Sequence, residues 1–281
     1  MIVPTASRAF AALLAIAAGT IGAGASCANG DSSRTSGGST SRAVAKTEDS
    51  AGGTIDLGGG GYTVRPVSAN GTLAGFVKLA GRSASDTMTM AKARAACGMR
   101  GAASSAIDTS SFANTVVWIA DPKSGKPLPI DKRTELSSDD CMLGPQTQAV
   151  VVGTTVNVFN DDKALHRLVF THVGQNDTLT VMPFFNTGQV VASERLAKEP
   201  GVVEVQCANH PWMRAYIVVL DHPYFDVTGN DGSFKIDSIT PGTYDVMVWR
   251  PGMGKPLAQR VEIAANGTAK LALTIDRAAA H

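Results

Sequence analysis

Short apolar runs separated by turn residues recur along most of the chain, and this pattern predicts a protein built of β-strands. The runs hold four to eight β-branched, aromatic and aliphatic residues, and Gly, Pro, Asn or Asp stands between them, as is typical of strands joined by turns. The strands predicted in this way cover residues 73–79, 115–120, 149–153, 156–160, 165–170, 178–185, 202–207, 214–220, 233–236 and 244–249, with two more in 259–275 that are joined at Asn266-Gly267. The small and polar residues 83–111 predict mainly loop, and the polar stretch 131–140 has no clear pattern. We therefore expect an all-β fold.

Residues 1–26 have the pattern of an export signal. Arg8 precedes an apolar stretch over residues 9–21, and small residues follow as far as Ser26. The stretch is too short and too rich in Ala and Gly for a convincing membrane span. Ordinary cleavage before Ser26 is one alternative, and the other is lipidation of Cys27, because residues 24–27 (GASC) resemble a bacterial lipobox apart from Gly24. We favour lipidation, since Cys27 would otherwise be an exposed leftover thiol.

Composition favours a flexible tether followed by an ordinary folded protein. Residues 27–61 are rich in Gly, Ser and Thr and hold too few large apolar residues to form a core. The chain of 281 residues has a formal net charge of +1, without a basic run, a phosphate-binding loop or a dinucleotide fingerprint. No G-x-S-x-G motif or other catalytic constellation is present. We expect a monomer that is not an enzyme, does not bind nucleic acid and meets the membrane only through an N-terminal lipid.

The strongest chemical signal is a C-x2-H-x2-M run formed by Cys207, His210 and Met213, with His166 about forty residues upstream. Two imidazoles, a thiolate and a weak axial thioether are the ligands of a blue-copper centre. Alternation along the strand 202–207 places Cys207 at the end of a core-facing row. The loop after Cys207 carries two of the remaining candidates, and His166 opens the strand 165–170.

On these residues, the part of the chain over 114–220 resembles the cupredoxins. Residues 156–170 resemble their apolar strand, Asn-x-Asp turn and ligand histidine, and residues 201–219 resemble their C-terminal half with the spacing of the amicyanins. The resemblance implies a Greek-key sandwich in which His166, Cys207, His210 and Met213 bind one type 1 copper ion. Many cupredoxins have Asn directly after the first ligand, where it ties the two ligand loops together. Arg167 stands there in this chain, and we therefore expect a less rigid site.

The four cysteines, at positions 27, 97, 141 and 207, constrain this interpretation. If Cys27 carries lipid and Cys207 binds copper, Cys97 and Cys141 remain to pair in an oxidising compartment, with a stabilisation of roughly 3–5 kcal/mol. A buried cysteine in an exported protein is more often half of a disulfide. The rival pairing of Cys141 with Cys207 would destroy the copper site.

The segment 221–276 has a different signature. The patterns T-x-x-x-G-x-F, over 228–234, and P-G-x-Y, over 241–244, predict hairpins. They resemble the carboxypeptidase regulatory-like module, a transthyretin-like sandwich without catalytic groups. We expect residues 62–113 to form a β segment that packs against it. His222 in this segment is only a weak metal candidate, and His172 is too far along its strand from His166 to share a metal.

These features together predict an electron-transfer protein of the cell envelope, periplasmic or tethered to the outer membrane. A closed four-ligand copper site has no open position for a substrate, and this favours electron transfer over oxidase chemistry. A redox partner protein would dock over the edge of His210, beside Pro211 and Trp212. One alternative is a structural or ligand-binding sandwich lipoprotein without metal, and another is a carrier or store of Cu(I).

Overall fold

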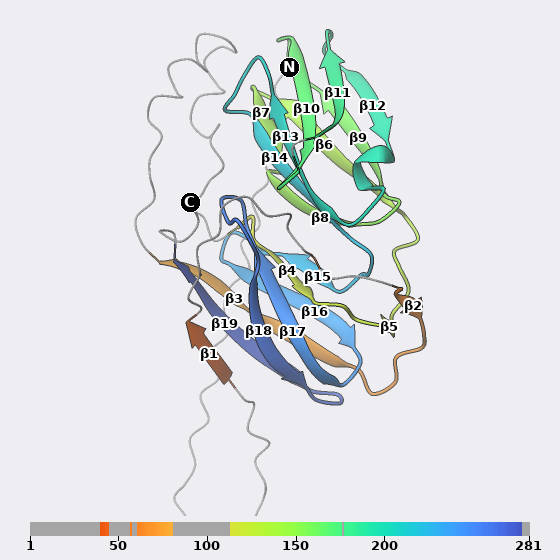
Figure 1. The fold of residues 1–281 in the computed structure, drawn as a ribbon, viewed down its shortest axis with the longest axis vertical. Coiled ribbons are helices and arrows are strands. Elements are labelled where there is room, and N and C mark those ends of the chain that lie inside the picture. Colours follow the sequence, from red (N-terminus) through yellow and green to blue (C-terminus); the bar gives the residue numbers. More distant parts are fainter. Residues whose placement is uncertain (1–39, 45–56, 58–60, 81–112, 176, 277–281) are drawn as a thin grey trace, which may run out of the picture. The chain divides into compact units, whose positions relative to one another are not determined.

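The computed structural model describes residues 40–44, 57, 61–80, 113–175 and 177–276, and in this part of the chain it confirms the all-β fold (Figure 1). Apart from one turn of 3-10 helix, η1 (Arg195–Ala197), the described elements are strands. None of the described residues form a helix long and apolar enough to cross a membrane. The predicted signal segment 1–26, Cys27 and Cys97 lie outside the described residues.

The first sandwich is formed by strands from the middle of the chain. They are β6 (Arg133–Asp139), β7 (Met142–Gly144), β8 (Thr147–Val151), β9 (Thr155–Asn160), β10 (His166–His172), β11 (Thr178–Phe184), β12 (Gln189–Ser193), β13 (Gly201–Cys207) and β14 (Arg214–Leu220). One sheet has the order β11-β10-β13-β14-β8, and the other has the order β12-β9-β6-β7 (Figure 1).

Alternation of side chains builds the core between these two sheets. Leu168 and Phe170 of β10 are buried with Val203 and Val205 of β13, whereas Arg167, directly before Leu168, is exposed. Successive side chains of a strand point to opposite faces of its sheet, so one face can be apolar while the other is solvated. Apolar burial on this face holds in place the strand ends that carry the candidate ligands.

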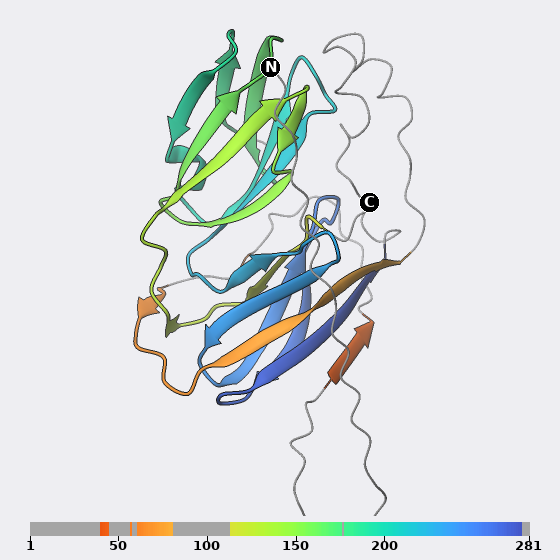
Figure 2. The same cartoon turned by 180° about the vertical axis from the view of Figure 1, so that it is seen from behind.

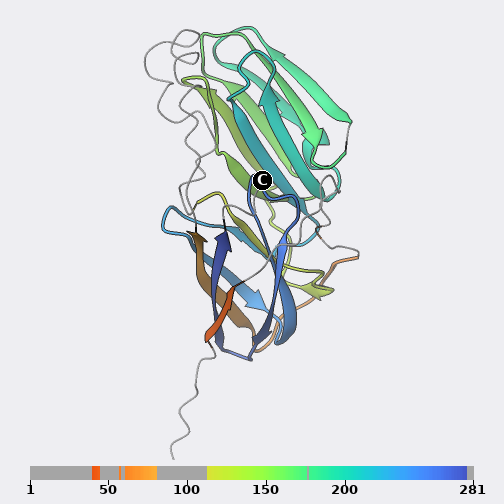
Figure 3. The same cartoon turned by 60° about the vertical axis from the view of Figure 1, so that its left-hand side comes forward.

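A second sandwich combines strands from before and after the first one in sequence. They are β1 (Thr40–Val44), β3 (Gly71–Ala80), β4 (Val116–Ile119), β15 (Phe225–Val227), β16 (Ser233–Ile239), β17 (Gly242–Trp249), β18 (Leu257–Ile263) and β19 (Thr268–Asp276). The sheet orders are β1-β19-β3-β16 and β15-β4-β17-β18, and a short pair joins β2 (Thr63–Val64) to β5 (Ser124–Gly125). Figure 2 shows the first of these sheets from behind, and Figure 3 shows β1 beside β19. Thus β3, from the N-terminal segment, lies between two strands of the C-terminal segment.

Strand β14 is buried on both of its faces. Ala215, Ile217 and Val219 belong to the core of the first sandwich, whereas Tyr216 and Val218 belong to the same apolar cluster as the core of the second. The Tyr216 ring packs edge-on against the ring of Trp249 with 5.6 Å between their centroids. This double burial explains why β14 reads as a continuous apolar run rather than an alternating one.

The structure adds strands that the pattern did not predict, namely β1, β2, β5, β6, β7, β12 and β15, and corrects the predicted hairpins. One of them, β1, lies within the predicted tether 27–61 and pairs with β19. Stretch 131–140 contains β6, whose Leu136 is its one buried large apolar residue, and β12 lies at the edge of the same sheet. The turn at 230–232 joins β15 to β16, the turn at 241 joins β16 to β17, and Asn266-Gly267 joins β18 to β19, but each of these turns connects strands of different sheets. A turn sequence specifies a reversal of the chain, not which strands pair after it.

Candidate metal centre

Two neighbouring strands and one tight loop bring the four candidate ligands to the same end of the first sandwich. β10 and β13 pair antiparallel with Leu168 opposite Cys207, so His166 lies just beyond the end of β13. The Cys207 N–H donates to the Met213 carbonyl (3.1 Å), and the Met213 N–H donates to the His210 carbonyl (2.9 Å). All four candidate side chains are buried, and Met213 belongs to the core cluster. These backbone bonds close the loop and turn its ligands inward.

Three ligand atoms converge on one point. The Nδ1 atoms of His166 and His210 are 3.0 Å apart, and the Sγ atom of Cys207 lies 3.6 Å and 3.5 Å from them, respectively. A circle through these three atoms has a radius of about 2 Å, close to the metal–nitrogen and metal–sulfur distances of about 2.0–2.3 Å found in protein sites with these donors. The three atoms therefore fit a metal ion in a near-trigonal arrangement.

Asp162 orients the first imidazole from behind. The Nε2 atom of His166 lies 2.9 Å from a carboxylate oxygen of Asp162, and the same carboxylate also accepts the Cys141 N–H at 3.0 and 3.1 Å. Burial alone would raise the pKa of Asp162, but these hydrogen bonds hold it below its ordinary value. An ionised carboxylate can only accept, so Nε2 carries the proton and Nδ1 is left as the ligand atom.

The charges of the site favour a thiolate at Cys207 and a neutral imidazole at His210. Burial would raise the pKa of the Cys207 thiol, but the hydrogen bond to His166 and nearby backbone N–H groups lower it. Burial and the charge of His166 lower the pKa of His210. Burial would also lower the pKa of His166, but its bonds to Asp162 and Cys207 raise it to about 9. A metal binds the deprotonated forms, so its uptake would displace a proton from His166.

Cys141 lies beside the site as well. Its Sγ atom and one ring nitrogen each of His166 and His210 are within 4.8 Å of one another. Cys141 is disulfide-bonded, whereas Cys207 is buried with a free thiol, so the rival pairing of these two cysteines is absent. Cys97 lies outside the described residues, and its pairing with Cys141 stays a prediction. Cys207 is therefore the cysteine beside the two imidazoles whose thiol is free to bind a metal.

The expected docking residues differ in exposure. Pro211 is exposed, but Trp212 is half-buried, because its ring packs 5.2 Å from the His210 ring and its Nε1–H donates to the Cys141 carbonyl (3.2 Å). The sequence did not single out two other apolar side chains next to the first ligand strand. Leu165 directly precedes His166 and is 54% exposed, and Phe185, the last residue of the predicted strand 178–185, is 63% exposed. Both residues fall within predicted strands, 165–170 and 178–185, but each lies just outside the observed strand, β10 or β11.

Asn209 supplies a tie between the ligand loops that the sequence did not lead us to expect. Its Nδ2–H donates to the Leu165 carbonyl (3.1 Å), and the neighbouring Ala208 N–H donates to the Arg167 carbonyl (2.8 Å). The Arg167 side chain is exposed and takes no part in the tie. The lower rigidity expected from Arg167 is thus offset by an amide on the opposite loop, between Cys207 and His210.

The other described histidines lie apart from this centre. His172 is buried with its Nε2 atom 3.7 Å from a carboxylate oxygen of Glu199. His222 is fully buried, and its Nδ1 atom accepts the Tyr224 N–H (3.1 Å). Neither belongs to the group of potential metal ligands found among the described residues.

Comparisons with known proteins give partial matches. Residues 219–271 match the family model "Polysaccharide lyase family 4, domain II", and not a carboxypeptidase regulatory-like family as the turn motifs suggest. No curated protein matches the chain.

Solved structures that are similar to this chain include a Cu-containing nitrite reductase from Thermus scotoductus SA-01, at 24% identity over 35% of this chain, with a TM-score of 0.28. The match spans only 23% of that reductase. A purple cupredoxin from Nitrosopumilus maritimus is 23% identical over 31% of this chain and 98% of its own, with a TM-score of 0.26. Amicyanin from Paracoccus versutus is 20% identical over 33% of this chain and 84% of its own, with a TM-score of 0.28.

Proposed function

We propose that this protein binds one type 1 copper ion and transfers electrons in the cell envelope. The observation that carries the proposal is the convergence of His166 Nδ1, His210 Nδ1 and Cys207 Sγ on a circle of about 2 Å radius, because two nitrogens and one sulfur in a trigonal arrangement suit copper. Met213, buried beside them, is the proposed axial ligand.

The donor set suits a one-electron carrier. Bound copper would accept and release one electron, and the soft sulfur ligands suit Cu(I) while the imidazoles suit Cu(II). The Asp162 carboxylate holds the ring of His166, and the Asn209 amide holds the two ligand loops together. Residues fixed in this way need little rearrangement between oxidation states. The four proposed metal ligands are buried, so a substrate would have no open position on the copper ion. We therefore propose that the protein is not an enzyme.

We propose that a redox partner protein docks where the ligand loops reach the surface. Pro211 offers an exposed apolar side chain there, and Leu165 and Phe185 add two more beside the strand that begins at His166. An envelope location, with lipid on Cys27 and a disulfide between Cys97 and Cys141, remains part of the proposal.

An absorption spectrum of the purified protein after addition of Cu(II) tests the proposal. We expect an intense blue or purple band that ascorbate bleaches and that is absent in Cys207→Ser. Arg167→Ser, which alters an exposed side chain next to a ligand, is the matched control and should retain the band. A wild-type protein that stays colourless with a titratable thiol at Cys207 would refute copper binding and favour a structural sandwich.

Voltammetry separates the electron carrier from a copper store. A carrier should show a reversible one-electron wave with oxidised and reduced forms that both retain the metal. A protein that binds Cu(I) tightly but loses the metal on oxidation would be a carrier or store of Cu(I) and not an electron-transfer protein.

A further inference from the structure

A second cysteine sulfur lies beside the metal centre and takes no part in the proposed copper site. The Sγ atom of Cys141 and one ring nitrogen each of His166 and His210 all lie within 4.8 Å of one another. Cys141 is fully buried and is disulfide-bonded. A sulfur in a disulfide is a poor metal ligand, because the thiolate is the form of cysteine that binds metals. The disulfide therefore withholds from the centre a ligand that stands next to it.

A tight hairpin turn places Cys141 in this position. Asp139 of β6 pairs with Met142 of β7. The two residues between them have positive φ angles, 49° at Asp140 and 55° at Cys141. Asn and Gly are the usual residues of such a turn, because they adopt positive φ at little cost. A cysteine is disfavoured in this conformation, so contacts outside the turn must hold it there.

The backbone of Cys141 is hydrogen-bonded to the residues that support both histidines. Its N–H donates to the Asp162 carboxylate, which also holds the ring of His166. Its carbonyl accepts the Nε1–H of Trp212 (3.2 Å), whose ring packs against the ring of His210. These bonds do not involve the sulfur, so they can keep Cys141 beside the two imidazoles after the disulfide is broken.

The sulfurs of the two cysteines lie at different positions around the imidazoles. The Sγ atom of Cys207 lies 3.6 and 3.5 Å from the Nδ1 atoms of His166 and His210, respectively. Cys207 is nevertheless not a member of the group that Cys141 forms with these histidines. A Cys141 side chain without its disulfide can turn about the Cα–Cβ bond and bring its sulfur closer to the other three donors. Two imidazole nitrogens and two thiolates are a donor set of tetrahedral zinc sites.

We propose that reduction of the disulfide at Cys141 converts the centre into a tetrahedral site for a metal ion with a filled d shell, Zn(II) or Cu(I). The four ligands of this site are Cys141, His166, Cys207 and His210. A dithiol reductant supplies the two electrons and two protons: one of its thiolates attacks the disulfide, its other thiol completes the exchange, and the reductant becomes a disulfide while the protein gains two thiols. The Cys141 thiol loses its proton when it binds the ion, and its sulfur takes the place of the Met213 thioether.

This proposal rests on the proposed copper function, whose ligands it shares, and adds a control on that function. A near-trigonal site with a weak axial thioether suits copper in both oxidation states, and it would exist only in the disulfide-bonded protein. In the reduced protein, a second thiolate favours a tetrahedral ion and opposes the change of oxidation state. The protein would carry electrons in an oxidising compartment and hold a filled-shell ion under reducing conditions.

Metal titration of the full chain, with and without prior reduction, tests the proposal. The protein is reduced with dithiothreitol, which is then removed without oxygen, and is titrated with Co(II) as a coloured substitute for Zn(II). We expect the thiolate-to-cobalt absorption band of reduced wild type to be roughly twice as intense as that of reduced Cys141→Ala, because two thiolates bind instead of one. Competition with a chelator should show Zn(II) bound at least about tenfold more tightly by reduced wild type than by reduced Cys141→Ala or by the disulfide-bonded protein.

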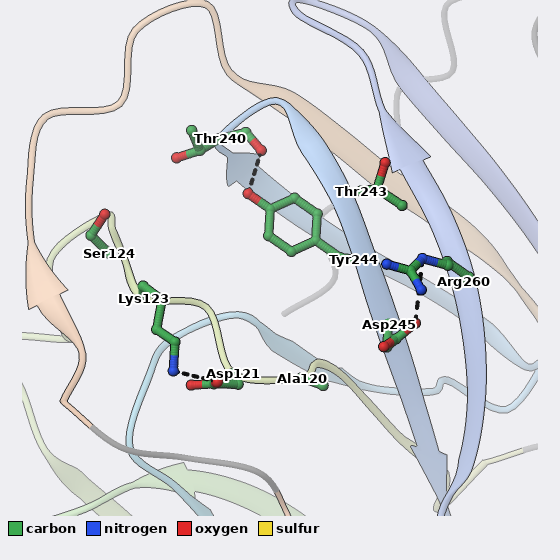
Figure 4. Close-up of a pocket in the computed structure, with 9 residues that line it drawn as sticks. All are labelled: Ala120, Asp121, Lys123, Ser124, Thr240, Thr243, Tyr244, Asp245 and Arg260. Atoms are coloured by element: carbon green, nitrogen blue, oxygen red, sulfur yellow. Dashed lines mark hydrogen bonds and ion pairs between the residues drawn. The ribbon is translucent and has the colours of Figure 1, made fainter.

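Two further variants complete the experiment. Cys97→Ala, which removes the predicted disulfide partner, should show the two-thiolate band without any reductant. Asp245→Asn is the control for metal held by exposed carboxylates. This carboxylate lines a polar pocket of the second sandwich, 4.0 Å from the Nε atom of Arg260 (Figure 4), and its replacement should leave the Co(II) band unchanged. Circular dichroism establishes that each variant folds.

Equal band intensities in reduced wild type and reduced Cys141→Ala would overturn the proposal, and so would a disulfide that dithiothreitol leaves intact in the folded protein. The copper function has a separate readout, the Cu(II) band of the disulfide-bonded protein. If that function is wrong, the Cu(II) band is absent. If only the switch is wrong, the Cu(II) band is present and the second thiolate is missing from the cobalt site.

Discussion

Replacement of Asp162 by Asn tests how the carboxylate behind His166 controls metal uptake. In the wild type, this carboxylate accepts from the His166 ring at 2.9 Å and from the Cys141 N–H at 3.0 and 3.1 Å. An asparagine in the same place has only one oxygen that can accept a hydrogen bond. Its NH2 group would face the Cys141 N–H or the His166 Nε2–H, which are donors themselves. Loss of such a support typically costs roughly 10–100-fold in metal affinity.

A second effect acts in the opposite direction and depends on pH. The pKa of His166 is about 9 in the wild type, and loss of the carboxylate should lower it, because the hydrogen bond and the charge of Asp162 help to raise it. At pH 7 only about 1% of wild-type His166 is unprotonated, and the unprotonated fraction should be larger in the variant. Protons therefore compete with copper far more strongly in the wild type at neutral pH, and this competition disappears above the raised pKa.

The two effects oppose each other at pH 7, whereas at high pH only the loss of the support remains. We expect Asp162→Asn to bind Cu(II) roughly 10–80-fold more weakly than the wild type at pH 9.5, and this deficit to be much smaller or absent at pH 7. Competition with a Cu(II) chelator, followed by the absorption band of the site, measures both affinities. Asp161→Asn, one residue away with an exposed side chain, is the control and should match the wild type at both pH values. An affinity ratio between Asp162→Asn and wild type that is the same at pH 7 and pH 9.5 would refute the reasoning.

Three further predictions concern stability. Asn209→Ala removes the donor to the Leu165 carbonyl and should lower the free energy of unfolding by about 0.5–1 kcal/mol. It should also speed the loss of copper to a chelator. An unchanged rate of copper release would show that this hydrogen bond does not hold the ligand loops together. Burial lowers the pKa of His222 to about 4 from 6.5, so its contribution to stability is complete above pH 6.5 and up to about 3 kcal/mol is lost as the pH falls to 4. Urea unfolding at pH 7 and pH 4 should show a smaller difference for His222→Asn than for the wild type, and equal differences would exclude this histidine as the cause. Tyr224→Phe leaves the Lys126 N–H without its acceptor at 2.9 Å and should cost about 1–3 kcal/mol, measured by thermal unfolding, whereas an unchanged melting temperature would show that water replaces the bond.

The sequence could predict the candidate ligands because their residue types are rare together and their spacing is short. Cys207, His210 and Met213 lie on one loop, so local chemistry is enough to group them. The bond from His166 to Asp162 depends instead on the turn between β9 and β10, since either Asp161 or Asp162 could have faced the ring. Hydrogen-bond partners outside one loop are set by the packing of strands, which no local pattern contains.

The fold was predictable where apolar residues alternate and not where backbone pairing does the work. β6 pairs in parallel with β9 over six residues, although Leu136 is the one buried large apolar residue of β6. Its backbone hydrogen bonds to β9 hold β6 in the sheet. The turn motifs near Gly232 and Gly242 were visible, but the pairing of the strands beside them was not. The sheet to which a strand belongs depends on which distant segments bury its two faces. β14 is apolar on both faces because each of them packs against a different apolar cluster.

The position of β3 has a consequence for the order in which the chain can fold. This strand is made early, yet it pairs with β16 and β19, so that Thr72 lies opposite Thr268 near the C-terminus. Its parallel ladder with β19 cannot form until residues 268–276 have been synthesised, whereas the strands of the first sandwich follow one another and can pair sooner. Long-range pairing of this kind is slow and leaves an apolar strand exposed in the meantime. Formation of β19 therefore completes the sheet around β3. A chain that is truncated before β19 would leave β3 without its parallel neighbour.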